Sequence, residues 1–259
     1  MNKGELLKIA GLVKSSAFAP QEHQRRPIEG HGKILYWGLG SGKSLGGIMA
    51  GQQAGGANVI VPASLRENFK KEVKKFKPGV PFDIQSYESF SKNIPKNLKD
   101  RALVIDESHR LGNAGIRSKA IESAARHAKK VVLLTGSPIR NSPNEISRLV
   151  NMAAGSKRLP ESEKEFNQKY IEKQVYNPGF LARHVLRKKP YSREVAKNLG
   201  DFRGKVRGLV SYYKPPQESK DYPSVSHHKV EVEMSKSQAH FSNLLSKNLG
   251  PVLRWKVEN

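Results

Sequence analysis

Seven consecutive residues near the N-terminus have the composition of a phosphate-binding loop. They directly follow the apolar run 34–37, and the next residues have a helical pattern. Glycines let backbone N–H groups turn inward around a phosphate, and a helix N-terminus adds the positive end of its dipole. We therefore predict contact with the phosphates of ATP, through Lys43 and its neighbours, and with Mg²⁺, through Ser44. The ATP-binding residues are Gly38, Leu39, Gly40, Ser41, Gly42, Lys43 and Ser44.

The alternative for this loop is a chance glycine-rich turn. Trp37 stands where the usual phosphate-loop pattern has its first glycine, so the fit is to a looser version of the pattern. A strand before the loop and a helix after it are the context that phosphate binding requires. The surrounding pattern therefore favours a nucleotide site.

Two adjacent acids follow another apolar run. Asp106 and Glu107 come directly after residues 102–105. Ligands of parallel sheets bind at the carboxyl ends of the strands, so both acids should face the phosphates held by Lys43. We assign Asp106 to Mg²⁺ and Glu107 to the water that attacks the phosphate, which makes Lys43, Asp106 and Glu107 the catalytic set. A solvated acidic turn is the alternative.

The elements that must position these residues are short and buried. Four runs are apolar at consecutive positions, which is typical of strands covered on both faces of a parallel sheet: 34–37, 59–61, 103–105 and 131–134. Helical patterns lie between them, and residues 66–77 place Phe69, Val73 and Phe76 on one face. The prediction is an α/β lobe over residues 1–155, with helices on both faces of the sheet.

Beyond the lobe the composition changes. Residues 156–223 read as a basic, mainly helical module, with ten Lys or Arg against two acids between Arg183 and Lys214. Such a surface can follow a nucleic-acid backbone, so we predict contacts at Arg187, Lys188 and Lys189. A solvated helical face is the alternative. In residues 224–259, a strand over 229–234 and a helix over 235–249, capped by Ser235, indicate the start of a further domain.

The overall composition is consistent with a nucleic-acid partner. Forty-six Lys and Arg against 23 Asp and Glu give a formal net charge of +23, although a generically basic surface would have the same balance. The chain has no cysteine, which excludes disulfides, thiolate zinc sites and cysteine nucleophiles. Because no apolar segment approaches the roughly 20 residues of a membrane span, we expect no membrane association and a cytoplasmic location.

The order of the motifs resembles that of superfamily 2 helicases, and of their Swi/Snf-like branch in particular. Residues 59–69 resemble motif Ia, 86–90 motif Ib, 106–109 a DEAH-type motif II and 134–141 motif III. Residues 211–213 and 234–238 resemble the approach to the second lobe, and its beginning, in viral and remodeller-like members. The resemblance implies a RecA-like P-loop lobe over 1–155 and an incomplete second RecA-like lobe over 224–259.

The resemblance also implies roles for individual residues. Gln24 is similar to the family's adenine-sensing glutamine, with Gln21 as a rival and a surface glutamine as the alternative. His109, Thr135 and Ser137 match groups that couple the ATP site to the nucleic-acid side. A further set matches positions along the nucleic-acid backbone, where ordinary loop structure is the alternative: Pro62, Ser64, Arg66 and Tyr87.

Two departures from the family pattern affect the expected activity. Ser108 replaces a commoner alanine or glycine, which is a small-for-small change. Motifs IV to VI, with the arginine that completes the family's ATP site, have no place in the last ten or so residues. Loss of such an arginine lowers phosphoryl transfer by about a thousandfold or more. We therefore expect a second RecA-like lobe in cis or trans, and weak hydrolysis by this chain alone.

These observations favour an ATP-driven nucleic-acid translocase or helicase over two other functions. By analogy with the Swi/Snf-like branch, double-stranded DNA is the expected track, in the cytoplasm, or in the host cytoplasm for a viral protein. A nonenzymatic, ATP-gated nucleic-acid-binding scaffold is the main alternative. A small-molecule kinase fits less well, because residues 86–90 and 134–141 would have no role in it.

Overall fold

The computed structural model describes five stretches of the chain, which divide into two units. The described residues are 22–25, 31–112, 115–176, 191–214 and 228–248. Residues 1–215 form the first unit and residues 216–259 the second. Within the described residues, no helix is long and apolar enough to cross a membrane.

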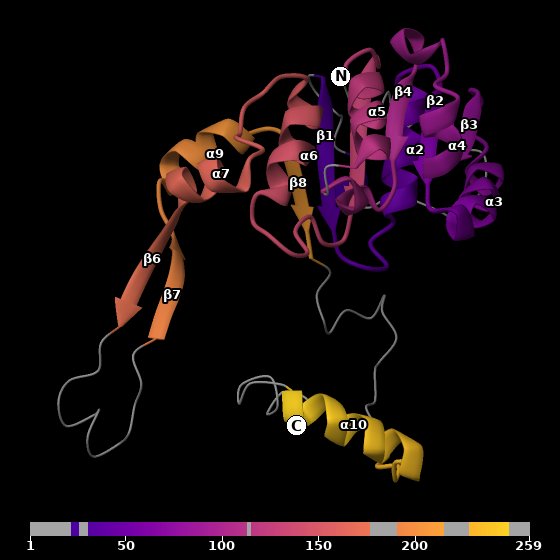
Figure 1. Cartoon of the computed structure of the whole chain (residues 1–259). Helices are drawn as coiled ribbons and strands as arrows, with labels where there is room; N and C mark the ends of the chain where they lie inside the picture. The colour runs from indigo at the N-terminus through magenta and orange to yellow at the C-terminus, as the bar shows by residue number, and fades with distance from the viewer. Residues whose placement is uncertain (1–21, 26–30, 113–114, 177–190, 215–227, 249–259) are drawn as a thin grey trace. The chain divides into compact units, whose positions relative to one another are not determined.

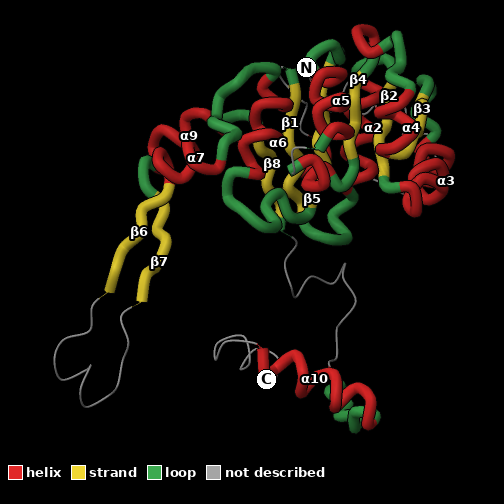
Figure 2. Tube along the Cα trace, viewed as in Figure 1, coloured by secondary structure: helices red, strands yellow, loops and turns green. Residues whose placement is uncertain are grey.

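A six-stranded parallel sheet forms the centre of the first unit (Figure 2). Its spatial order is β3-β2-β4-β5-β1-β8. The four strands that the apolar runs predict are all present and are neighbours in this order, which confirms the predicted α/β lobe. The strands are β1 (Gly32–Trp37), β2 (Ala57–Val61), β3 (Phe82–Ser86), β4 (Ala102–Ile105), β5 (Lys130–Thr135) and β8 (Val210–Tyr213).

Helices cover both faces of this sheet (Figure 1). One hydrophobic cluster joins the sheet to α2 (Lys43–Gln53) and α3 (Arg66–Phe76). The other joins it to the helices of the opposite face, which are α4 (Tyr87–Lys92), α5 (Ile116–Ala125) and α6 (Glu145–Ala154). Four short 3-10 helices complete the described part of the lobe: η2 (Glu22–Arg25), η3 (Ala63–Leu65), η4 (Leu98–Asp100) and η5 (Ser108–Leu111).

Helix α3 follows its predicted pattern closely. Phe69 and Phe76 are buried, and Val73 packs against the same cluster. Lys77 ends the helix in the left-handed conformation, with φ at 43°, directly before Pro78. The amphipathic period therefore predicted the buried face of this helix, and Pro78 is the stop signal that predicted its end.

The segment between α6 and β8 differs from the predicted, mainly helical module. Its described residues contain α7 (Glu163–Tyr170), α9 (Leu199–Val206) and an antiparallel ribbon of β6 (Ile171–Tyr176) and β7 (Tyr191–Ala196). Residues 210–213, counted in the module, form β8 and pair with β1 in the main sheet. The prediction of a mainly helical segment is therefore wrong for the described residues, because residues 171–176 and 191–196 pair with each other as strands, a contact that overall composition does not capture.

The second unit confirms its predicted helix but not its predicted strand. Helix α10 (Lys236–Asn248) begins after Ser235, whose hydroxyl accepts from the Gln238 N–H at 3.3 Å while the Gln238 side chain accepts from the Ser235 N–H at 3.0 Å. Residues 229–234 form no strand, and Val230, Val232 and Met234 are exposed. A strand needs a hydrogen-bonded neighbour, and the described residues of this unit provide none.

Close packing of α2 on the sheet leads to a first prediction. A Cβ added at Gly47 would lie 2.9 Å from Cγ1 of Val104 and 3.0 Å from Cδ1 of Leu134, both buried. Gly47→Ala should therefore destabilise the lobe by about 1–3 kcal/mol, although alanine favours helix by about 1 kcal/mol.

Gly204→Ala is the control. It lies on α9, where an added Cβ meets nothing within 4 Å, and should stabilise the folded protein by about 0.5–1 kcal/mol. Urea unfolding of both variants tests this, and a Gly47→Ala midpoint at or above wild type would contradict it.

Candidate nucleotide-binding and catalytic site

The phosphate-binding loop links the end of β1 to the start of α2. Gly40 and Gly42 have φ values of 72° and 76°, in the left-handed region that favours glycine. A Cβ on Gly42 would lie 2.2 Å from the amide nitrogen of Gln24. The Ser41 hydroxyl donates to the Gly38 carbonyl at 2.6 Å and closes the turn. The loop therefore has the tight conformation that its glycines predict.

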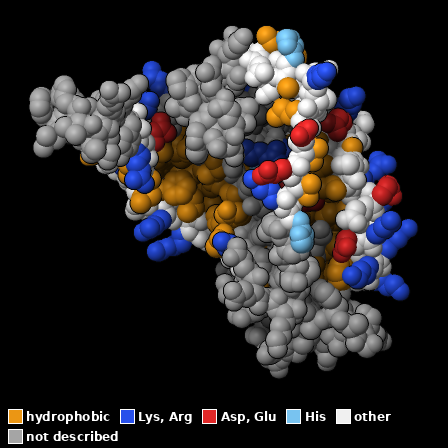
Figure 3. Space-filling view, turned by 90° about the horizontal axis from the view of Figure 1, so that it is seen from below, with side chains coloured by type: hydrophobic (Ala, Val, Ile, Leu, Met, Phe, Trp, Pro, Cys, Tyr) orange, Lys and Arg blue, Asp and Glu red, His pale blue; other side chains and the backbone are white. Residues whose placement is uncertain are grey.

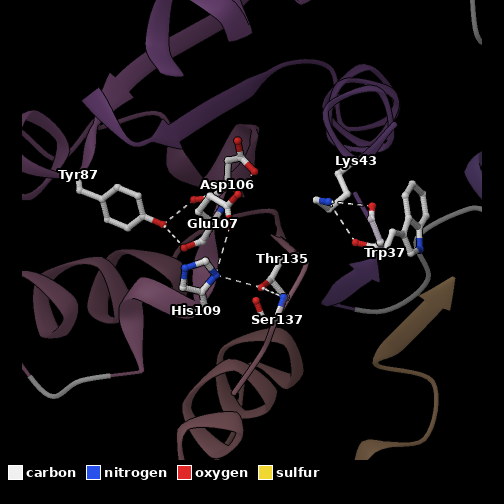
Figure 4. Close-up of polar contacts among 9 residues, drawn as sticks. Trp37, Lys43, Tyr87, Asp106, Glu107, His109, Thr135 and Ser137 are labelled. Carbon is white, nitrogen blue, oxygen red and sulfur yellow. Dashed lines mark hydrogen bonds and ion pairs between the residues drawn. The ribbon is translucent and has the colours of Figure 1, made fainter. Parts of the chain in front are cut away.

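Lys43 points from the first turn of α2 toward the loop backbone (Figure 4). Its ammonium donates to the carbonyls of Trp37 at 3.1 Å and Gly38 at 3.0 Å. Burial lowers the pKa of Lys43, whereas the charges of Glu107 and Asp106 act in the opposite direction. The lysine therefore lies at the same sheet edge as the two acids and within their electrostatic field.

The two acids are held by their backbone at the end of β4. The Asp106 N–H donates to the Ile60 carbonyl at 2.8 Å, and the Glu107 N–H donates to an Asp106 carboxylate oxygen at 3.0 Å. Glu107 has φ 50° and ψ 45°, a conformation that costs a residue with a side chain roughly 1–2 kcal/mol. Backbone strain of this kind is common at functional sites.

Tyr87 supports this turn from α4. Its hydroxyl donates to the Asp106 carbonyl at 2.6 Å and to the Glu107 carbonyl at 3.2 Å (Figure 4). Burial raises the pKa of Tyr87, so the phenol stays protonated and can donate. The sequence predicts a nucleic-acid contact for this residue, whereas in the structure its hydroxyl contacts the acidic turn.

A chain of polar contacts joins the ends of β4 and β5. The Nδ1 atom of His109 lies 3.2 Å from the Glu107 carboxylate and 3.2 Å from the Thr135 hydroxyl, which accepts from the Ser137 N–H at 3.1 Å (Figure 4). His109 is buried, and burial, followed by the charge of Arg140, lowers its pKa. The predicted coupling residues are therefore brought together around a histidine that favours the neutral form.

Gln24, which the family resemblance assigns to adenine, lies beside the loop. Its side chain is buried and donates to the Ser41 carbonyl at 2.9 Å from helix η2. The Nε2 atom of His23 lies 3.1 Å from the same carbonyl. The rival Gln21 lies outside the described residues.

A cavity of about 460 Å³ opens beside the loop and has one wall that the sequence does not predict. Gln24 and residues 40–45 line it on one side, and α3 contributes Glu72, Lys75 and Phe76 on the other. The sequence shows Glu72 and Lys75 only as part of a charged helix face. Their approach to the loop depends on α3 packing beside α2, which no local pattern contains.

A second cavity, of about 1080 Å³, is lined by three of the seven predicted nucleic-acid residues. Pro62, Ser64 and Tyr87 line it, whereas Arg66 does not and pairs with Glu67 at 3.6 Å. Sequence reasoning missed the cations of this groove, which come from four separate elements or loops: Lys92, Arg110, Arg117 and Arg140.

The remaining predicted contacts, Arg187, Lys188 and Lys189, lie outside the described residues. On the face seen in Figure 3, Lys and Arg side chains outnumber Asp and Glu side chains. Among the described residues, no group of three or more His, Cys, Asp or Glu side chains could hold a metal ion. A cation at this site would therefore need oxygen ligands beyond the two carboxylates.

Comparisons with known proteins assign the family. The profile of the SNF2-related domain family matches residues 69–254. A protein of Acanthamoeba polyphaga mimivirus named as an ATP-dependent RNA helicase, L538, is 26% identical over 230 residues, which cover 84% of this chain and 47% of that protein. R563 of the same virus, named in the same way, is 25% identical over 231 residues, covering 71% and 38%.

The third relative comes from yeast. The ISWI chromatin-remodeling complex ATPase ISW2 of Saccharomyces cerevisiae is 30% identical over 122 residues, which cover 36% of this chain and 11% of that protein. The chain thus spans less than half the length of each of these relatives. Because the family profile covers well over half of the chain, the chain belongs to the SNF2-related domain family, a family of helicase-like, nucleic-acid-dependent ATPases.

Proposed function

We propose that this lobe binds Mg²⁺ and ATP and couples ATP hydrolysis to movement on double-stranded DNA. The observation that carries the proposal is the meeting of three groups at one sheet edge. The glycine loop with Lys43, the Asp106–Glu107 turn and the contact between His109 and Thr135 come from β1, β4 and β5, which are neighbours in the sheet. Phosphate binding, water activation and coupling each need one of these groups.

The loop fits a polyphosphate. Two left-handed glycines turn backbone N–H groups inward, and the N-terminus of α2 adds its dipole. The Lys43 ammonium donates to the carbonyl oxygens of Trp37 and Gly38, which orient it. Both of these acceptors are neutral. Phosphate oxygens would supply the anionic partner that this ammonium can bind.

The acidic turn fits a divalent cation. Burial, followed by the charge of Glu107, raises the pKa of Asp106 to about 6, and the hydrogen bond from the Glu107 N–H and the charge of Lys43 compensate only in part. This buried negative charge favours Mg²⁺, which binds through one or two carboxylates and keeps several waters. We assign Asp106 and the Ser44 hydroxyl to the ion. Mg²⁺, when bound, stabilises charge that develops on the phosphate oxygens.

Glu107 is the group we assign to water activation. Its carboxylate contacts His109, and its left-handed backbone turns the residue away from the direction of the strand. Because His109 also contacts Thr135, a change in the charge of Glu107 acts on the end of β5. We infer that this link carries the state of the ATP site to motif III and onward to the nucleic acid.

Gln24 is the residue we assign to recognition of adenine. Its side chain is buried against the loop at Ser41, and it borders the cavity that also contacts Lys75. An amide side chain can both donate and accept, which suits the edge of a purine. The assignment rests on the family resemblance together with this position.

Nucleic acid is assigned to the larger groove. Four cations, together with Pro62 and Ser64, line it, and such groups bind phosphates without reading sequence. We propose double-stranded DNA and translocation without strand separation, on the resemblance to the Swi/Snf-like branch. The two viral relatives are named as RNA helicases and the yeast relative as a chromatin-remodeling ATPase, so binding to both nucleic acids must be measured.

We further propose that a second RecA-like lobe, in cis or in trans, supplies the arginine that completes the ATP site. Such an arginine contributes about 10³–10⁵ in rate in related phosphoryl-transfer sites. Hydrolysis by the described lobe alone is therefore expected to be slow. We propose a cytoplasmic location, in the host cell if the protein is viral.

Lys43 and Glu107 test the ATPase directly. Lys43→Ala should weaken binding of Mg²⁺ and ATP by at least about tenfold, because the loop loses its cation. Glu107→Gln should leave binding within about threefold and slow hydrolysis at least about 100-fold, as expected for a group acting on water. Calorimetric titration and phosphate release measure the two effects. If Lys43→Ala hydrolyses ATP at the normal rate, the proposal is excluded. If the protein together with its second lobe binds ATP but does not hydrolyse it, an ATP-gated scaffold is favoured instead.

The raised pKa of Asp106 predicts that this carboxyl destabilises the folded protein as pH rises, and that its replacement by asparagine removes this loss. Between about pH 4 and pH 6 the folded protein retains a proton that the unfolded chain releases, so this carboxyl lowers the free energy of unfolding as pH rises through that window. Asp106→Asn should therefore be more stable than wild type by about 1–2 kcal/mol at pH 7.5 and equal to it near pH 4. Urea unfolding without Mg²⁺ measures this difference.

The control for this effect is Asp100→Asn, an exposed acid of η4, which should show no such gain. Addition of Mg²⁺ should reduce the advantage of Asp106→Asn, because the ion stabilises only the native carboxylate. An advantage of equal size at pH 4 and pH 7.5 would contradict the assignment of buried charge to Asp106.

The nucleic-acid contacts predict a change in salt dependence. Replacing Arg187, Lys188 and Lys189 together by alanine should flatten the slope of log affinity against log salt by up to about 3, and Arg66→Ala by about 1. Lys99→Ala, near the amino end of β4, should leave the slope unchanged. Fluorescence anisotropy with duplex DNA and duplex RNA of equal length measures both slope and preference. Wild-type slopes in both variants would remove these four residues from the interface.

A further inference from the structure

Strand β8 is tied to the phosphate-binding loop through the backbone. It follows the α7–α9 segment in the chain and pairs with β1 in parallel, with Tyr213 opposite Trp37. The N–H of Gly38, the first residue of the loop, donates to the Tyr213 carbonyl at 2.9 Å. The loop therefore starts on a hydrogen bond to a residue far along the sequence.

Side chains extend this connection to the opposite side of the loop. The rings of His23 and Tyr213 are stacked, with centroids 3.7 Å apart and planes 9° from parallel. His23 also meets Trp37 edge-on at 4.7 Å, and the Trp37 indole N–H donates to the Ser211 hydroxyl at 3.0 Å. Three aromatic rings from η2, β1 and β8 thus form one cluster behind the loop.

Two neighbouring residues of η2, one of them in this ring cluster, contact the Ser41 carbonyl. His23 and Gln24 both contact the Ser41 carbonyl, at 3.1 Å and 2.9 Å. They belong to a four-residue 3-10 helix, which has too few internal hydrogen bonds to be stable alone. Contacts outside η2 must therefore fix its position, and the stack of the His23 ring on Tyr213 is one of these contacts.

We propose that Tyr213 is a positioning residue of the nucleotide pocket. Its ring holds His23, and through the adjacent backbone Gln24, against the Ser41 carbonyl. This contact arranges the side of the pocket that faces the nucleotide base before the nucleotide binds. The inference rests on the proposed function and extends it, because it assigns a role in nucleotide selection to the last residue of β8.

The test is a double-mutant cycle on nucleotide affinity. Tyr213→Ala and His23→Ala should each raise the Kd for ATP in the presence of Mg²⁺ by about 2- to 10-fold, the range expected for loss of one ring pair. The Kd of the double variant should lie within about twofold of the larger of the two single-variant Kd values, because both changes remove the same contact. Tyr213→Phe keeps the ring and should restore wild-type affinity.

Base selection provides a readout that a purely structural role would not change. Tyr213→Ala should lower the preference for ATP over GTP, since the placement of Gln24 is lost while the phosphate loop remains. Tyr212→Ala is the matched control, because Tyr212 is 62% exposed and its ring lies against Tyr36 instead. This control should keep both the affinity and the preference.

The possible outcomes separate this inference from the proposed function. If Lys43→Ala abolishes ATP binding while Tyr213→Ala and His23→Ala bind ATP as wild type, the positioning role is wrong and the ATPase assignment stands. If Lys43→Ala itself binds ATP normally, the function is wrong. Additive effects of the two ring changes would also overturn the inference. Should Tyr213→Ala unfold, Tyr213→Leu and His23→Ala provide the same comparison.

Discussion

The parallel register of the central sheet is the constraint on which the candidate site depends. Tyr36 pairs with Thr135, and Ile60 with Ile105, so β1, β2, β4 and β5 end at one edge. Every group assigned to phosphate, metal or coupling follows one of these strand ends or lies on a helix packed beside them. A register shift of one residue would turn every side chain of a strand to the opposite face of the sheet and would also move the loop that follows the strand. Because side chains are packed on both faces, such a shift is unfavourable, and the geometry of the site is kept.

The charges at this edge are arranged for a ligand. Asp106 and Glu107 are adjacent. Asp106 is partly buried, and Glu107 has a left-handed backbone conformation. Each therefore has a higher free energy in the protein without ligand than an ordinary surface acid would have. Lys43 lies in their field but donates to carbonyls. A bound cation would compensate the charge of the two acids, and bound phosphates would compensate that of Lys43. Binding would thereby offset the free-energy cost that these groups impose on the protein without ligand.

Local patterns predicted the elements that carry chemistry but not the contacts between distant segments. Runs of buried apolar residues gave four of the six strands, and the loop and acidic motifs marked two of their ends. Residues 211–213 resemble the approach to another lobe, whereas in the structure they belong to β8 and pair with β1. A strand of four residues holds too little local pattern to predict this pairing. The positions of Lys75 at the cavity and of Tyr213 at the phosphate-binding loop likewise depend on packing between segments that are distant in the sequence. The predicted strand at 229–234 had the right alternation but no neighbour among the described residues.

A crystal structure of the chain with Mg²⁺ and a nonhydrolysable ATP analogue would test the central claim most directly. The account predicts the triphosphate against the backbone N–H groups of residues 40–44, with the Lys43 ammonium moved from the Trp37 carbonyl to a phosphate oxygen. Mg²⁺ should lie between Ser44 and Asp106. A nucleotide bound elsewhere, or a Lys43 ammonium that stays on the two carbonyls while the analogue is bound, would contradict it.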